Sequence, residues 1–312
     1  ETGKSQQERW EEAAAACNDF ITTLGNKYPM DEYRLIRDYQ NGEIIFDRRY
    51  GSTNTFEKNN YPVGYNLGQS GNTPSQNLVD AYEMIDGTPF DWNNPEHKSN
   101  PYANRDPRLA MSILTNNVEF KDRTIEAWTG GRDGKGVIHA TRTGYYIYKF
   151  IDPNLDLLQN RTSVHHWVIM RYAEILLSYA EAMNEAYGPT GNVGYRLNAV
   201  RALNQVRNRV GVEMPAVPTA ISKEELREKI RNERRVELAF EDHRFWDVRR
   251  WMIAPETLGT PLRGVEITKI SDEEFEYKPI EVEKRTFEPK MYLYPIPQAD
   301  LNTTGWVQNP LW

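Results

Sequence analysis

Apolar residues recur at helical spacing near the start of the chain. Trp10, Phe20 and Leu24 fall on one face together with several alanines, which predicts an amphipathic helix over residues 8–24. An isolated helix of this length is only marginally stable in water. We therefore expect this helix to pack against the later helices.

The same spacing returns over residues 166–250, which we expect to be strongly helical. A first helix should end at the Gly-Pro-Thr-Gly sequence of residues 188–191, and a second should end at Gly211. The pair has about the length of a tetratricopeptide unit. Ser222 and Glu225 form a capping-box pattern that predicts the start of a third helix, which we expect to continue to Trp251. The apolar faces of the first and second helices comprise Ile169, Tyr172, Leu176, Ala180, Met183 and Tyr187, then Leu197, Val200, Leu203, Val206 and Val210.

Residues 25–165 lack sustained periodicity and are rich in Asn, Gly, Pro and Tyr. They predict one short helix around residues 75–84, a flexible glycine loop at 130–136 and a short strand at 145–150. Long irregular stretches inside a compact domain are usually functional or disordered, and the many Tyr and Trp residues argue against disorder.

After residue 255 the pattern alternates, so residues 265–268 and 275–287 are expected to pair as a hairpin. These patterns predict a mainly α fold, with tetratricopeptide-like helix pairs, long irregular loops and a few short strands. We expect one domain in four segments: a scaffold helix in 1–24, a ligand-binding region in 25–165, a helical scaffold in 166–254, and a hairpin with a C-terminal strap over the helices in 255–312.

Charge and composition exclude several classes of protein. The 312 residues include 38 Lys and Arg against 45 Asp and Glu, a net charge of −7 that argues against general nucleic-acid binding. No apolar run is long enough to form a transmembrane segment. Cys17 is the single cysteine, so no disulfide can form within the chain. Aromatic residues make up 12% of the chain although its mean hydropathy is −0.74, which favours rings at a surface.

Two carboxylates on the third helix are a candidate catalytic pair. Glu233 and Glu237 share a helix face, as an acid/base pair for glycoside hydrolysis could. The surrounding run is rich in arginine, however, and guanidinium partners would keep both carboxylates ionised. We therefore expect a structural ion network, no catalytic residue and no enzyme.

Metal and cofactor motifs are absent from the sequence. The histidines at 97, 139, 165, 166 and 243 have no metal-ligand spacing. A calcium-loop pattern beginning at Asp152 fails because Leu157 and Ser163 replace the Gly and Glu that it needs. The glycines of 130–136 lack phosphate-loop order. We expect no metal site and no cofactor.

The remaining candidates are aromatic and polar residues in the irregular region. Rings that stack on flat apolar surfaces, with amides and a guanidinium nearby, suit a sugar and would also suit a peptide. Each ring could instead anchor a loop to the helical body. The candidate ligand-binding residues are Tyr65, Asn66, Trp92, Tyr102, Trp128 and Arg132, of which we expect Trp92 or Trp128 to stack on ligand.

Several segments resemble, in this order along the chain, those of SusD/RagB proteins. They are residues 104–109 (NRDPRL), 171–185 (RYAEILLSYAEAMNE), 203–211 (LNQVRNRVG), 233–251 (ERRVELAFEDHRFWDVRRW), 292–298 (YLYPIPQ) and 308–310 (QNP). The last four residues, Asn-Pro-Leu-Trp, depart from the family's more usual Asn-Pro-Gly-aromatic ending.

The resemblance implies a surface lipoprotein of the Bacteroidetes outer membrane that sits on a SusC-like, TonB-dependent transporter. It implies capture of an oligosaccharide or polysaccharide, without catalysis, by loops that tetratricopeptide-like helix pairs support. Family members are usually longer, so we expect this chain to be a C-terminal part, with the signal peptide and lipid-bearing Cys in a segment that it lacks. Alternatives are an oligopeptide-binding RagB-like protein, a glycoside hydrolase and a helical-repeat scaffold for protein partners.

Overall fold

The structure is a computed structural model that describes residues 3–312. Its α-helices are α1 (Gln6–Thr23), α2 (Thr55–Asn60), α3 (Gln76–Val79), α4 (Pro95–Ser99), α5 (Arg108–Ser112), α6 (Tyr172–Tyr187), α7 (Ala199–Arg207), α8 (Lys223–Glu237), α9 (His243–Arg250), α10 (Ala254–Thr257) and α11 (Gln298–Thr304). The strands are β1 (Ile44–Arg49), β2 (Ile113–Leu114), β3 (Glu119–Phe120), β4 (Arg123–Thr124), β5 (Tyr146–Ile147), β6 (His166–Arg171), β7 (Leu262–Lys269) and β8 (Phe275–Glu283). Short 3-10 turns are η1 (Gly25–Lys27), η2 (Tyr33–Arg37) and η3 (Pro289–Tyr292).

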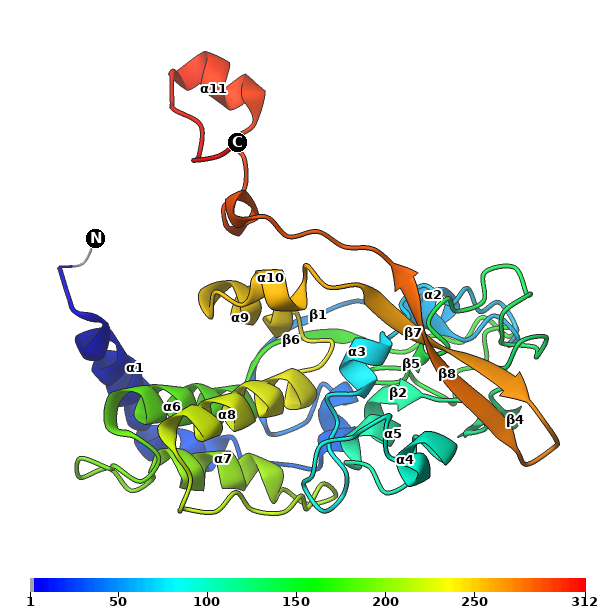
Figure 1. The fold of residues 1–312 in the computed structure, drawn as a ribbon, viewed down its shortest axis with the longest axis horizontal. Helices are drawn as coiled ribbons and strands as arrows, with labels where there is room; N and C mark the ends of the chain where they lie inside the picture. The colour runs from blue at the N-terminus through cyan, green and yellow to red at the C-terminus, as the bar shows by residue number, and fades with distance from the viewer. Residues whose placement is uncertain (1–2) are drawn as a thin grey trace.

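The long helices gather at one end of the molecule and the β7–β8 hairpin lies at the other (Figure 1). Helix α1 packs on α6, which also contacts α7 and α8, so the first helix packs on later helices as predicted. The apolar core between these helices includes Ala14, Leu176 and Leu203, all fully buried. The predicted capping box is confirmed: the Glu225 backbone N–H donates to Ser222 Oγ at 3.2 Å, and the Ser222 N–H donates to Glu225 Oε2 at 3.0 Å.

Residues 166–171 are a correction to the predicted helix. They form β6, which pairs antiparallel with β1, and α6 begins only at Tyr172. Ile169, assigned to the helix face, is 41% exposed on this strand. Six residues with apolar positions fit a strand as well as a helix turn, and the pairing with β1 decides between them.

The third predicted helix is also shorter than expected, because α8 ends at Glu237 and α9 is a separate helix. Phe240 and Asp242 between them have left-handed backbone, with φ of 64° and 63°. The second predicted helix ends sooner as well, because α7 stops at Arg207 and leaves Val210 exposed. The short helix predicted around residues 75–84 is α3, which spans only four residues after its Ser75 cap.

A second apolar core lies under the loops and the hairpin. Tyr82, Tyr145 and Tyr146 are fully buried there, so much of the tyrosine in the irregular region is core. The predicted hairpin is confirmed as β7–β8, with Ile267 opposite Tyr277, and β5 is a two-residue part of the predicted strand at 145–150. The C-terminal segment with α11 extends away from the body instead of crossing the helices as expected (Figure 1).

A buried ion network joins the two cores. Glu237 at the end of α8 accepts from Arg108 at 2.8 Å, Arg171 at 2.7 Å and Arg209 at 2.6 Å, and its side chain is fully buried. Arg108 also binds Glu233 at 2.5 Å. The network comprises Glu43, Asp106, Arg108, Lys149, Arg171, Arg207, Arg209, Glu233, Glu237 and Glu241. The predicted structural role of Glu233 and Glu237 is confirmed.

The left-handed turn after α8 directs the side chain of Glu241 toward this network. Glu241 binds Arg171 at 2.8 Å and Lys149 at 2.6 Å. A left-handed non-glycine residue costs roughly 1–2 kcal/mol, which such buried ionic hydrogen bonds can offset. Burial alone would raise the pKa of Glu241, but Arg171 and Lys149 outweigh it and lower the pKa to about 2.

We predict that Glu237→Gln destabilises the fold severely. The change leaves buried guanidinium groups without their carboxylate, and breaking a buried ion pair typically costs about 3–5 kcal/mol. Denaturant unfolding measures the loss. The matched control is Glu228→Gln on the same helix, where an exposed carboxylate pairs with Arg231 and the expected change is below about 1 kcal/mol. Equal effects of the two substitutions would contradict the role given to the network.

We also predict acid sensitivity with a defined sign. Burial opposes ionisation, but Arg209, Arg171 and Arg108 hold the pKa of Glu237 well below its ordinary value of 4.5. Arg171 and Lys149 lower the pKa of Glu241 in the same way. Carboxylates with a lowered folded-state pKa stabilise the fold above their unfolded pKa and lose that contribution as the pH falls through the folded value. The melting temperature should therefore drop steeply between pH 4.5 and about 2. A melting temperature that stays constant across this range would refute the prediction.

Candidate functional site

Four aromatic rings form a row at the hairpin end of the molecule. Phe275 and Tyr277 are alternate residues of β8 and so point to the same face. The ring centre of Phe275 lies 5.3 Å from that of Trp128, and the ring centre of Tyr277 lies 5.3 Å from that of Tyr102. This aromatic row of Trp128, Phe275, Tyr277 and Tyr102 therefore combines three segments that are distant in sequence.

The aromatic row borders a cavity of about 510 Å³, here called the aromatic cleft. Tyr102, Phe275 and Tyr277 line it, and its polar lining includes Ser99, Asn100, Thr115, Asn116, Asn117, Glu273 and Glu274. Burial raises the pKa of Tyr102 and of Tyr277, so both hydroxyls stay protonated at neutral pH. Half-buried rings beside amides and hydroxyls can hold a ligand that offers an apolar face and hydrogen-bonding groups.

Asp133 fixes the loop that carries Trp128. Its fully buried carboxylate accepts from Arg123 at 2.6 Å and from the backbone N–H groups of Glu126 at 2.9 Å and Gly64 at 3.1 Å. Gly134 must be glycine here, because a Cβ at that position would lie 1.8 Å from the Trp128 carbonyl oxygen. The glycine loop expected to be flexible is thus tied to the body next to the aromatic row.

Asp133 also brings three of the predicted ligand-binding residues together. Its bond to Gly64 places Tyr65 and Asn66 beside the segment of Arg132. Asn66 and Arg132 are exposed, and Arg132 pairs with Glu126 at 2.5 Å. Tyr65 is 7% exposed and donates its hydroxyl to the Phe120 carbonyl, so it presents almost no surface to a ligand.

The other predicted residues divide between two places. Tyr102 lines the aromatic cleft and Trp128 belongs to the aromatic row, whereas Trp92 lies outside both. Trp92 donates its indole N–H to Asp80 at 3.0 Å and packs edge-on against Phe90. As ligand contacts, all six residues stay predictions.

Sequence reasoning missed Phe275, Tyr277, Asn116 and Asp133. Two aromatics at alternate positions of a predicted hairpin are a visible signal for the first pair. No local pattern marks Asp133, whose partners lie in other segments. Among residues 3–312, no group of three or more His, Cys, Asp or Glu side chains could hold a metal ion, and no helix combines the length and apolarity that crossing a bilayer requires.

Paired helices at one end, and loops with a hairpin that form an aromatic cleft at the other, define a mainly helical protein with a candidate ligand site. A model of the SusD family matches residues 42–312, and the chain belongs to this family. The resemblance identified in the sequence and the predicted fold class are both confirmed.

Known relatives agree with this assignment. The chain is 34% identical over 120 residues to SusD-like protein P2 of Formosa agariphila, a match that covers 37% of this chain and 22% of that protein. A SusD-like protein of Bacteroides fragilis superimposes with a TM-score of 0.79 and 30% identity, over 97% of this chain and 62% of its own. A SusD-like carbohydrate binding protein of the same species gives 0.77 and 29%, over 95% and 61%. The chain thus spans less than two thirds of these solved structures.

Proposed function

We propose that the protein captures glycans at the cell surface as a component of a TonB-dependent polysaccharide uptake system. It binds an oligosaccharide or polysaccharide without cleaving it and presents it to a SusC-like transporter in the outer membrane. A lipid on an N-terminal cysteine anchors it there. Membership of the SusD family and the similarity to a SusD-like carbohydrate binding protein support this proposal.

The aromatic row beside the aromatic cleft is the observation that carries the proposal. A pyranose ring has an apolar C–H face that stacks on aromatic rings and a rim of hydroxyls that bonds to amides. Trp128, Phe275 and Tyr102 are half-buried, so each is held firmly and still presents an edge or face. In this proposal Trp128 and Tyr102 contact the sugar ring directly, and Asn66 and Arg132 extend the site along the neighbouring loops.

The state of the carboxylates supports binding without hydrolysis. A glycoside hydrolase needs one carboxylic acid that is protonated near neutral pH. Glu237 is buried among three arginines that hold its pKa low, and Glu233 is ion-paired to Arg108 and Arg207. Neither side chain borders the aromatic cleft.

We predict that Trp128→Ala weakens polysaccharide binding about tenfold, because a well-placed aromatic contact contributes about 0.5–1.5 kcal/mol beyond the area that it buries. Affinity electrophoresis against a panel of neutral and acidic polysaccharides identifies a binder, and calorimetry on that binder gives the dissociation constants. Trp92→Ala is measured alongside. Trp306→Ala is the matched control, since this tryptophan is 63% exposed in the C-terminal segment and should not affect binding.

Three results would count against the proposal. Unchanged affinity in both Trp92→Ala and Trp128→Ala would remove these rings from the site. Binding of oligopeptides with no retention by any polysaccharide would favour the RagB-like alternative. New reducing ends after incubation with polysaccharide would show that the protein is an enzyme.

A further inference from the structure

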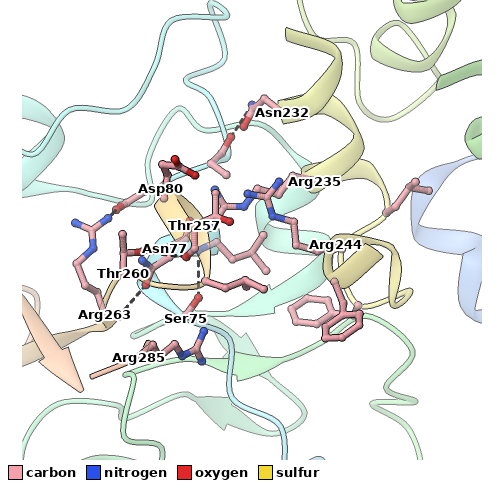
Figure 2. Close-up of a pocket in the computed structure, with 18 of the residues that line it drawn as sticks. Ser75, Asn77, Asp80, Asn232, Arg235, Arg244, Thr257, Thr260, Arg263 and Arg285 are labelled. Atoms are coloured by element: carbon pink, nitrogen blue, oxygen red, sulfur yellow. Dashed lines mark hydrogen bonds and ion pairs between the residues drawn. The ribbon is translucent and has the colours of Figure 1, made fainter. Parts of the chain in front are cut away.

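A second cavity, of about 710 Å³, lies between α3, the α8–α9 turn, α10 and the start of β7. Four arginines line it, so it is called the arginine cavity: Arg235, Arg244, Arg263 and Arg285 (Figure 2). Its volume lies within the range of small-molecule sites, roughly 300–1,000 Å³. The cavity shares no lining residue with the aromatic cleft.

Two of the four arginines are neutralised by partners in the fold. Arg263 donates to Asp80 at 2.8 Å, and Arg285 approaches Glu283 at 3.4 Å. These two guanidinium groups therefore have a structural explanation that needs no ligand.

Arg235 and Arg244 have no such partner. The Arg235 guanidinium donates to the backbone carbonyl of Asn77, and this is its only hydrogen bond to another of residues 3–312. The Arg244 guanidinium makes neither a hydrogen bond nor an ion pair within that same range. Figure 2 shows the two guanidinium groups side by side at the cavity. Carboxylates of Asp242 and Glu256 also line the cavity, but neither is ion-paired to these arginines in the described chain.

Arg235 and Arg244 are both partly buried, and adjacent cations that lose part of their hydration are costly unless an anion compensates them. Burial and, to a smaller extent, repulsion from Arg244 together lower the pKa of Arg235 to about 10. Burial likewise lowers the pKa of Arg244. The fold keeps both charges at the cavity wall, which is the arrangement that an oxyanion such as a carboxylate or a sulfate group would neutralise.

The rest of the lining fits the body of a sugar. Hydroxyls and amides of Ser75, Asn77, Asn232, Thr257 and Thr260 surround the arginines. The Thr257 and Thr260 hydroxyls donate to backbone carbonyls, so their oxygens can accept from a ligand hydroxyl. Phe240 and Phe245 add apolar surface.

We propose that the arginine cavity binds an acidic saccharide, whose carboxylate or sulfate group is held by Arg235 and Arg244. This inference rests on the proposed glycan-binding function and narrows its ligand to glycans that carry such groups. The aromatic cleft and the arginine cavity are then two separate contacts for one class of ligand.

The test is calorimetric titration of the protein with galacturonate, galactose 6-sulfate, galactose and inorganic sulfate at matched ionic strength. We expect at least one of the two acidic sugars to bind at least tenfold more tightly than both galactose and inorganic sulfate. Arg244→Gln and Arg235→Gln should each weaken that binding at least tenfold, and Arg235→Lys should weaken it less than Arg235→Gln does. Arg196→Gln, at an exposed position before α7, is the matched control and should bind as the unmodified protein does.

The outcomes separate the sources of binding. Galactose that binds as well as the acidic sugars, or inorganic sulfate that binds as well as they do, would overturn the proposal. So would unchanged affinity in Arg244→Gln, a variant whose folding is checked by its melting temperature. If the acidic sugars fail while polysaccharide binding through Trp128 persists, only this inference fails. If the unmodified protein binds none of the acidic sugars and none of the polysaccharides, the proposed function itself is contradicted.

Discussion

The buried ion network around Glu237 determines how four separate segments of the chain meet. It connects the end of α8 with α5, the β6–α6 junction and the segment after α7, so it locks the helical core to the loop region. Pairs of this kind contribute little net stability compared with apolar packing, but removing one partner is expensive. The network therefore specifies how these segments align, because each charged group meets its ion-pair partners only when its own segment is in place. Within the irregular region it holds the segments that carry Glu43, Arg108 and Lys149.

Helix α8 links this scaffold to the arginine cavity. Glu233 and Glu237 are one turn apart and point into the ion network, whereas Arg235 lies on the other side of the helix and lines the arginine cavity. The turn after α8 bends the chain so that Glu241 reaches Arg171 and Arg244 reaches the same cavity. One helix thus presents compensated charge on its inner face and uncompensated charge on its outer face, and the latter is available to a ligand.

Local signals in the sequence predict much of the fold. The capping box at Ser222, the amphipathic first helix and the alternation in the hairpin depend on neighbouring residues, and the structure confirms them. The break at Phe240 and the strand at 166–171 depend on partners far along the chain. A prediction from helical periodicity alone therefore continues a helix through both places, which the structure shows to be wrong. The same limit applies to the site. The aromatic row needs Trp128, Phe275 and Tyr102 to meet in space, and composition reveals only that such rings are abundant.

Glycan capture at the aromatic row can be tested by hydrogen–deuterium exchange of the protein with and without a bound polysaccharide. We predict slower exchange on binding in the segments that build the aromatic row and the aromatic cleft, residues 99–117, 126–136 and 273–277. The helical end around α1, α6 and α7 should exchange at the same rate in both states. Protection confined to that helical end, with unchanged exchange in the three segments, would contradict glycan binding at the aromatic row.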